Sequence, residues 1–424
     1  MTETPEIIQR LAPRSNIIVG LRLRDIGFLL GILMIVVSQL LRYQAAPWTP
    51  ILTANDGIQQ LGISTTLTAG LSFCASIIML IASLSAFSAN RDRIPQPLSW
   101  SVFACLALAA LWIIVSAIND GMSDLVYKTG TPLVLVSVAM VFCGFDNHLI
   151  SIIYRLCPFG AAFFAALAGI SFIQAYMTYG WTVFGSSSTF VYFIASFWLS
   201  SLVICRSIIE GKRVFFVYIL LGILLLEAVL LHSRSWVIQV FLLLLGYTFL
   251  SSSDPLLKRV FKVALLATIL FVAYRVLVSQ FDDFLIAFLD KLGSDTRSEQ
   301  YRIVFSQITP RIWLLGGGLN ATYRFGSVMT GSIDNQYLYL AYHWGIFTVI
   351  SYVFPLLYAV LSGLRNIDDI EVRTNTFVLI LWMCALGGLS VYNVLSINIP
   401  TLILPMIGGF VVNRIHIIGQ VIQQ

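Results

Sequence analysis

The chain has 424 residues, of which 58% are hydrophobic and 11% charged, and its formal net charge is +5 at pH 7. Its mean hydropathy of +0.89 excludes a water-soluble domain of this length and indicates that most of the chain lies in lipid. The Lys and Arg residues are scattered between apolar blocks, a distribution that argues against nucleic acid as a partner.

The N-terminal segment, residues 1–24, is polar and holds Arg10, Arg14, Arg22 and Arg24. The apolar run that follows is too long for the hydrophobic part of a signal peptide, and no small-residue cleavage site accompanies it. We therefore expect a retained cytoplasmic tail. No Pro/Gly/Ser-rich linker or charge run divides the rest of the chain, which predicts one membrane domain.

Spanning helices are expected to account for most of that domain. A helix needs about 20 mostly apolar residues to cross a bilayer, and about 12 runs meet this requirement. They predict an all-α polytopic bundle with transmembrane helices in residues 25–278 and 335–415, and a cytoplasmic tail at 416–424. The expected spans are 25–42, 63–88, 98–118, 130–146, 149–177, 188–207, 213–231, 235–251, 259–278, 335–362, 375–393 and 398–415.

Basic residues between the spans set the expected orientation. The short loops on the outer side would hold only Arg42, Lys128 and Arg234, whereas the cytoplasmic side would hold many more. Under the positive-inside rule this asymmetry places both termini in the cytoplasm. The basic residues on the cytoplasmic side would be Arg10, Arg14, Arg22, Arg24, Arg91, Arg93, Arg206, Lys212, Arg213, Lys258, Arg259, Lys262, Arg365, Arg373 and Arg414.

One large polar connection, residues 279–334, would then lie outside the membrane. Loops longer than about 12–15 residues are usually functional or disordered. Its first part places apolar residues at helical spacing, which predicts short amphipathic helices on the membrane surface. Those apolar residues are Phe281, Phe284, Leu285, Phe288, Leu289 and Leu292.

Polar motifs occur at three places at or near this connection. His232-Ser233-Arg234-Ser235 lies between two apolar runs, where an arginine either snorkels to the interface or faces a polar cavity. Arg297 and Tyr301 recur at helical spacing, and Gly316-Gly317-Gly318 follows, which would let the backbone turn tightly or approach a ligand closely. Asp334, at the head of the next span, is either its N-cap or part of a polar site.

The chemistry of these motifs points to a polyanionic ligand. A guanidinium presents a planar fork of donors that holds phosphate oxygens bidentately. Asn335, Gln336 and Tyr339 would extend the polar patch along one helical face, while His343 would be buried with its hydrogen bonds satisfied. The six cysteines form no CxxC pair, and no histidine has metal-ligand spacing, so neither a metal nor another cofactor is expected.

In order and position these stretches resemble the bacterial O-antigen polymerase (Wzy) and O-antigen ligase superfamily over roughly residues 230 to 350. The proline lies farther from the glycines than in that family, as Pro310 before Gly316, and Asp334 replaces a histidine typical of the ligases. The replacement favours a polymerase. The matching stretches are Ser233-Arg234, Arg297 with Tyr301, and Asp334-Asn335-Gln336-Tyr337-Leu338 through Gly345.

The resemblance implies a GT-C-like, metal-independent glycosyltransferase of the Gram-negative inner membrane. It would join undecaprenyl-pyrophosphate-linked oligosaccharide repeat units at the periplasmic face, with a chain-length regulator and a flippase as partners besides membrane lipid. The implied roles are pyrophosphate binding by Arg234, Arg297, Arg302 and Arg324, acid–base or orienting action by Asp334 and Glu299, and sugar contact by Tyr301, Asn335, Gln336 and Tyr339.

Two other functions stay open. A ligase that moves finished polysaccharide onto the lipid A core would use the same chemistry with a different acceptor. A flippase or transporter of lipid-linked sugars would need charges deep within many helices. The expected spans hold few charges, chiefly Arg155, Glu227 and Arg275, so a one-sided site is favoured over a path through the membrane.

Overall fold

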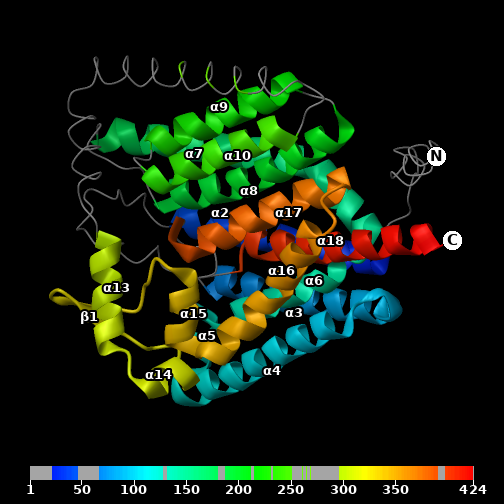
Figure 1. Ribbon diagram of the computed structural model, residues 1–424. Helices are drawn as coiled ribbons and strands as arrows, with labels where there is room; N and C mark the ends of the chain where they lie inside the picture. Colours follow the sequence, from blue (N-terminus) through cyan, green and yellow to red (C-terminus); the bar gives the residue numbers. More distant parts are fainter. Residues whose placement is uncertain are drawn as a thin grey trace.

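The computed structural model describes residues 22–45, 66–127, 131–179, 187–211, 214–230, 233–250, 296–389 and 397–423, with single helical positions at 260, 264 and 268. Within these ranges the chain is a helical bundle with one small β-hairpin (Figure 1). Eight of the described helices are long and apolar enough to cross a membrane, by length and composition. The chain is a polytopic membrane protein.

The long helices account for most of the described residues. They include α2 (Leu23–Ala45), α3 (Thr66–Ala89), α4 (Gln96–Asn119), α7 (Asn147–Tyr179), α8 (Ser187–Glu210), α9 (Val214–Leu230) and α10 (Arg234–Leu250). The C-terminal part adds α16 (Ile346–Leu364), α17 (Ile370–Cys384) and α18 (Ile399–Gln423). Short elements lie between them: η1 (Arg91–Arg93), α5 (Gly121–Tyr127) and the π-helical turn η4 (Ala385–Leu389).

Burial separates central helices from peripheral ones. In the apolar window of α8, 89% of the residues are buried inside the protein, whereas in α4 only 22% are. A helix that is apolar all round but exposed on most of its surface requires lipid as its solvent. α4 therefore lies at the lipid-facing edge, and α8 lies in the core of the bundle.

The predicted span at residues 130–146 is wrong as a spanning α-helix. The segment forms a 3-10 helix, η2 (Pro132–Ala139), continued by the short α6 (Met140–Cys143), and nearly all of its side chains are buried. Gly144 and Gly409 of α18 approach so closely that neither has room for a Cβ atom. Hydropathy alone cannot distinguish an apolar segment buried in protein from one that faces lipid.

The predicted span at residues 335–362 begins too early, because two helices share it and only the second, α16, is long and apolar enough to cross a membrane. α15 (Gln336–Trp344) ends at Gly345, whose φ of 82° stops the helix, and α16 begins at the next residue. A positive φ of this kind is favourable only for glycine. α15 is thus a separate short helix that packs on α14 and α16.

The count of about 12 spans is larger than the described structure supports. The expected spans at 213–231 and 235–251 correspond to apolar helical stretches of fewer than 18 residues, Phe216–Val229 and Ser235–Leu250. The expected span at 259–278 and the apolar residues between 281 and 292 fall outside the described residues, except for positions 260, 264 and 268.

The described part of the large polar connection contains more than amphipathic helices. α13 (Thr296–Gln307) is polar over most of its surface and buries only Val304 fully, and α14 (Pro310–Leu315) is short. β1 (Tyr323–Phe325) pairs antiparallel with β2 (Val328–Thr330), so that Arg324 lies opposite Met329. This hairpin was not predicted, since its two three-residue strands are too short to show a period of two.

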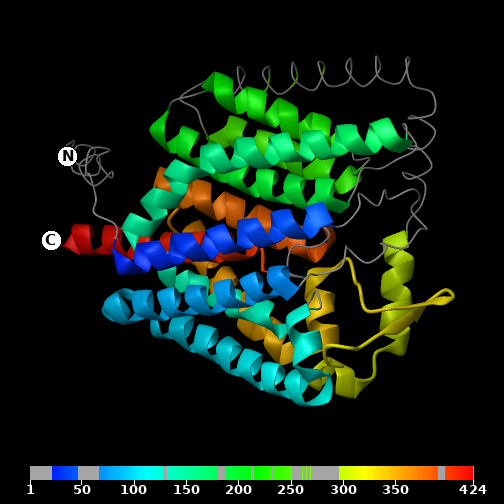
Figure 2. The same ribbon diagram turned by 180° about the vertical axis from the view of Figure 1, so that it is seen from behind.

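The bundle has two distinct ends. The end that carries α13, α14, α15 and the hairpin is called the loop end here, and the end where α2 begins and α18 finishes is called the terminal end (Figures 1 and 2). Two buried polar contacts lie at the terminal end: Arg24 forms an ion pair with Asp146, and His148 Nδ1 lies 2.9 Å from Asp25 Oδ2. Their side chains are at most 13% exposed.

Candidate functional site at the loop end

One face of α13 turns toward the bundle and the other toward solvent. Arg297, Gln300, Tyr301 and Val304 follow the i, i+3, i+4, i+7 spacing of a single helical face, and all are at least partly buried. Glu299 is two residues from Arg297, about 200° around the helix, and is exposed. Only the inward face can form a site together with α15.

The glycine triplet after α14 packs against the end of α15. The Gly317 and Gly318 N–H groups donate to the carbonyls of Tyr342 and His343 at 2.8 and 2.9 Å, which satisfies two carbonyls in the last turn of α15. A Cβ atom on Gly316 would lie 2.5 Å from the His343 carbonyl oxygen. A Cβ atom on Gly345 would lie 2.5 Å from the Leu314 carbonyl oxygen. Contact between two backbones therefore explains these glycines without a ligand.

Two of the predicted site residues contact each other directly. Arg297 Nε donates to Asp334 Oδ2 at 3.0 Å, and the two side chains are 33% and 26% exposed. This ion pair joins α13 to the residue before the N-cap of α15, across 37 positions of sequence. It is accessible enough to meet a ligand, and it is a charge-assisted hydrogen bond of ordinary length.

Gln300 connects this ion pair to the hairpin, a role that the sequence did not reveal. Its Oε1 accepts the Asp334 backbone N–H at 3.1 Å, while its Nε2 donates to the Tyr323 hydroxyl at 2.8 Å and to the Ser332 carbonyl at 3.2 Å. Burial raises the pKa of Tyr323 to about 12, so its hydroxyl stays protonated and donates to the Ser332 carbonyl. The sequence signal that could have identified Gln300 is its position three residues after Arg297, which places both side chains on one face of α13.

The residues after Asp334 have structural partners. Asn335 is the N-cap of α15, because its Oδ1 accepts the Leu338 N–H at 3.1 Å, so the alternative that assigned the cap to Asp334 is wrong. Asn335 Nδ2 also donates to the Gly387 carbonyl of η4 at 3.1 Å. Gln336 is fully buried and Tyr339 is 4% exposed, whereas Tyr301 and Asn335 are partly exposed.

Two other predicted site residues pair with each other on the opposite face of α13. Arg302 donates from Nε and Nη2 to the two carboxylate oxygens of Glu299, at 2.9 and 2.7 Å. These hydrogen bonds lower the pKa of Glu299, which makes its carboxylate a weaker base. The structure therefore separates Glu299 and Arg302 from Arg297 and Asp334.

The two remaining arginines come from other elements. Arg324 lies exposed on β1, and its backbone N–H and carbonyl both hydrogen bond with the side-chain amide of Gln307 at 2.9 Å, which attaches the hairpin to the end of α13. Arg234 is the first residue of α10, and its side chain lies outside the described residues, as does His232. The turn η4 contacts both α10 and α15, so α10 reaches the loop end.

His343 is buried as expected, and it holds both ends of the hairpin segment. Its Nδ1 lies 2.9 Å from the Gly318 carbonyl and its Nε2 lies 3.0 Å from the Gly331 carbonyl. A neutral imidazole donates to one of these two oxygens, depending on its tautomer. Burial lowers the pKa of His343 more than the two carbonyl partners raise it.

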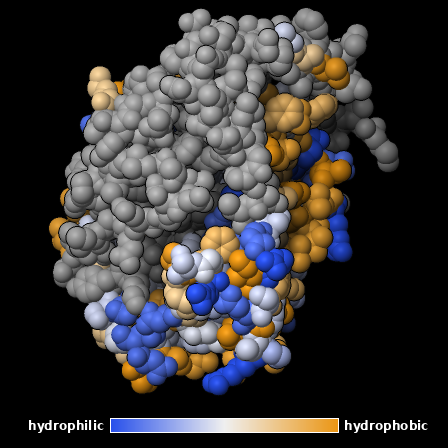
Figure 3. All heavy atoms as spheres, turned by 90° about the vertical axis from the view of Figure 1, so that its left-hand side faces the viewer, coloured by the Kyte–Doolittle hydropathy of each residue, from blue (hydrophilic) through white to orange (hydrophobic). Residues whose placement is uncertain are grey.

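The outer surface of the loop end is mixed in character. In Figure 3, which faces this end, hydrophilic residues gather over the lower part of the view and hydrophobic residues lie among them and along the rim. Within the described ranges no three His, Cys, Asp or Glu side chains gather as a metal site would require. The polar surface near Arg297 is thus built from arginine, carboxylate, amide and phenol groups.

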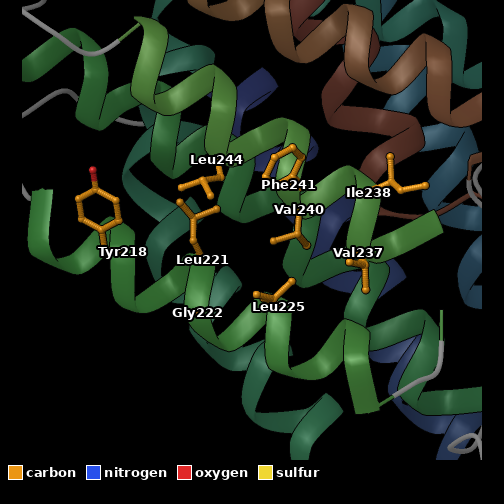
Figure 4. A pocket seen from close by; sticks show the side chains of 9 residues that line it. All are labelled: Tyr218, Leu221, Gly222, Leu225, Val237, Ile238, Val240, Phe241 and Leu244. Carbon is orange, nitrogen blue, oxygen red and sulfur yellow. The ribbon is translucent and has the colours of Figure 1, made fainter. Parts of the chain in front are cut away.

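A cavity of about 220 Å³ lies between α9 and α10 (Figure 4), and none of the predicted site residues lines it. Its lining is almost wholly apolar and includes Leu221, Leu225, Val237, Phe241 and Leu244. Apart from the Tyr218 hydroxyl, the lining is made of hydrocarbon side chains and a glycine, which suits an acyl or isoprenoid chain better than an anion.

Comparison with known proteins adds no assignment to this geometry. The chain matches no model of a protein family and no curated protein sequence.

Proposed function

We propose that the protein is a glycosyltransferase that polymerises undecaprenyl-pyrophosphate-linked oligosaccharide repeat units into O-antigen or a related surface polysaccharide. It would act at the periplasmic face of a Gram-negative inner membrane, with both termini in the cytoplasm and the loop end in the periplasm. The observation that carries the proposal is the Arg297–Asp334 ion pair, which joins two of the three motif stretches at one partly exposed place.

The proposed reaction breaks the bond between the anomeric carbon of the donor sugar and its pyrophosphate oxygen. The hydroxyl of the acceptor sugar forms the new glycosidic bond and loses its proton, and the lipid pyrophosphate leaves with the bonding electron pair. Negative charge develops on the leaving group, and a fixed guanidinium stabilises that charge. We assign this role first to Arg297, with Arg234 and Arg324 as further candidates.

Asp334 is proposed to orient Arg297 and then to accept the hydroxyl proton. While Asp334 holds the guanidinium, the pair presents no net charge, and an arriving pyrophosphate competes with the carboxylate for the arginine. Exchange of one anion for the other would free Asp334 beside the acceptor hydroxyl. Glu299 and Arg302 are left out of the proposed site because they pair on the opposite face of α13.

Sugar contacts are proposed for Tyr301 and Asn335, which are partly exposed next to the ion pair. Gln336 and Tyr339 are buried, so we place no sugar against them. An aromatic ring and an amide are suited to stacking on a pyranose face and to hydrogen bonding its hydroxyls.

Deletion of the gene, followed by gel analysis of surface polysaccharide, tests the proposal. A lost polymerase leaves lipid A core that carries a single repeat unit. Bare core with accumulated lipid-linked polymer would indicate a ligase instead, and a loss of export would indicate a transporter. Complementation with the wild type should restore the ladder, whereas complementation with Arg297→Ala should not. Arg297→Lys keeps the charge but not the planar fork, and it should restore the ladder only in part.

A further inference from the structure

The short helix α14 exposes two large apolar side chains. Leu314 and Leu315 are 51% and 60% exposed, and no residue of α14 is buried. An exposed apolar patch on a folded protein usually marks a surface that contacts a partner or a membrane. The residues around α14 indicate which of the two, a protein partner or a membrane, this surface contacts.

The C-terminus of α14 adjoins the outer turn of a spanning helix. Gly345, the residue before α16, packs against the backbone of Leu314 and Leu315. The first turns of α16 expose Phe347 (58%) and Ile350 (56%). Since α16 is a membrane-spanning candidate, these side chains face lipid, and Leu314 and Leu315 extend the same apolar surface past the end of the helix.

A second spanning helix reaches the same place. The Trp112 indole of α4 donates to the Trp344 carbonyl at 3.1 Å, and the two tryptophan rings pack edge to face. Beyond Trp112, α4 exposes Ile114 and Ile118, the latter by 77%. α14 therefore lies where two lipid-facing helices end, at the boundary between hydrocarbon and headgroups.

The other residues of α14 are of types that favour such a boundary. Trp313 is half-buried and stacks on Phe305, with ring centroids 5.9 Å apart. Arg311 is exposed and is one turn away from Leu314 and Leu315. Tryptophan concentrates at membrane interfaces, and arginine reaches headgroup phosphates while its stem covers apolar surface.

We propose that α14 is an interfacial anchor that dips into the lipid leaflet at the loop end. Leu314 and Leu315 insert among the acyl chains, and Arg311 contacts headgroup phosphates. The anchor holds α13, and with it Arg297, at the level of the lipid headgroups. The proposal stands on the exposure of α14 and its continuity with α4 and α16, and it holds whether or not the protein transfers sugars.

The hairpin supplies a matched control. Val328 and Met329 are 61% and 60% exposed, so they resemble Leu314 and Leu315 in character and exposure. The hairpin, however, projects beyond α13 and away from the spanning helices (Figure 1). An apolar residue there should meet water.

Spin labels in a reconstituted bilayer distinguish the two places. The full chain, with exposed Cys74 and Cys384 replaced by Ser, receives Leu315→Cys, Val328→Cys or Ile350→Cys, and each variant is labelled in phosphatidylcholine–phosphatidylglycerol nanodiscs. Power saturation compares collision with oxygen, which concentrates in lipid, and with a water-soluble nickel chelate. The label at Leu315 should favour oxygen, as at Ile350, whereas the label at Val328 should favour the nickel chelate.

Equal nickel accessibility at Leu315 and Val328 would overturn the proposal. Shielding of the Leu315 label from both collision partners would also overturn it, because that result means burial against protein. If Leu315→Cys fails to fold, as judged by its elution profile, Leu314→Cys takes its place and must give the same oxygen preference.

Discussion

The ion pairs at the two ends of the bundle differ in burial. At the terminal end the Arg24 and Asp146 side chains are 11% and 6% exposed, and Asp25 is fully buried beside His148. At the loop end Arg297 and Asp334 are 33% and 26% exposed. A buried pair cannot lose a partner without leaving a charge in a low-dielectric interior, whereas a partly exposed pair can exchange a partner for a ligand or water.

This difference in burial indicates a structural role for the pairs at the terminal end and a ligand-binding role for the pair at the loop end. The terminal-end pairs join the start of α2 to the residues around the start of α7, and thereby fix how the helices pack. The loop-end pair joins a polar surface helix to the start of α15 and stays within reach of solvent. Substitutions at the two ends should therefore separate stability from activity.

The largest expected effect is the loss of stability in Asp146→Ala. Removing one partner of a buried ion pair typically costs about 3–5 kcal/mol, because the other charge, here on Arg24, remains buried. Thermal unfolding of the purified protein in detergent should show a clearly lowered midpoint. Asp368→Ala, which changes an exposed carboxylate, is the control and should leave the midpoint unchanged. An unchanged midpoint in Asp146→Ala would contradict the claim that the buried ion pair at the terminal end stabilises the fold.

Asp334→Asn should have a smaller effect in free energy than Asp146→Ala, and it should lower activity instead of stability. The amide keeps the shape of the side chain but loses the charge that orients Arg297, and misplaced catalytic groups cost on the order of 10²-fold in rate. The proposed polymerisation activity should fall by that order, while the thermal midpoint stays within error of the wild type. A fall in stability comparable to that of Asp146→Ala would show that the ion pairs at the two ends contribute alike to stability.

The pH dependence of stability should carry a contribution from His343. Its pKa is about 6.5 when unfolded and lower when folded, so below about pH 6.5 the unfolded chain binds the proton more readily and stability falls as pH falls. One such group contributes at most about 1.4 kcal/mol per pH unit. Unfolding midpoints between pH 7 and pH 5 should fall less steeply in His343→Gln than in the wild type.

The control for that titration is His416→Gln, which changes a histidine on α18 near the terminal end. An identical slope in His343→Gln and the wild type would show that His343 does not titrate with folding. A steeper fall in His343→Gln than in the wild type would contradict the sign of the argument.

The smallest effect is expected from Glu299→Gln. Glu299 is exposed and pairs with Arg302 one turn away, and exposed pairs of this kind contribute little. Neither the thermal midpoint nor the polymerisation rate should change measurably. A strong loss of activity would instead return Glu299 to the site as the base.

The sequence predicted the membrane class and most long helices, because lipid imposes a length and an apolar composition that hydropathy detects. It failed at residues 130–146 and at Gly345. The first failure arose because burial against α18 and burial in lipid select the same side chains. The second arose because one glycine with positive φ divides an apolar run without changing its hydropathy.

The candidate site was predicted in part for a similar reason. Arg297 and Asp334 stood out because charged residues are rare in this chain, but their contact spans 37 positions and no local pattern encodes it. Helical spacing could have excluded Glu299 from the face of Arg297. Gln300 and Tyr323 were missed, since an amide and a phenol become noticeable only when their partners are known.

The most direct test of the proposed site compares two arginines on the same helix. Purified protein in proteoliposomes receives undecaprenyl-pyrophosphate-linked repeat units, and product length is read on a gel for Arg297→Ala and Arg302→Ala. We predict that Arg297→Ala slows polymerisation by about 10²–10³-fold, the usual cost of removing a group that stabilises developing charge. Arg302→Ala should polymerise at the wild-type rate. Equal activity in the two variants would contradict the assignment of the site to the inward face of α13.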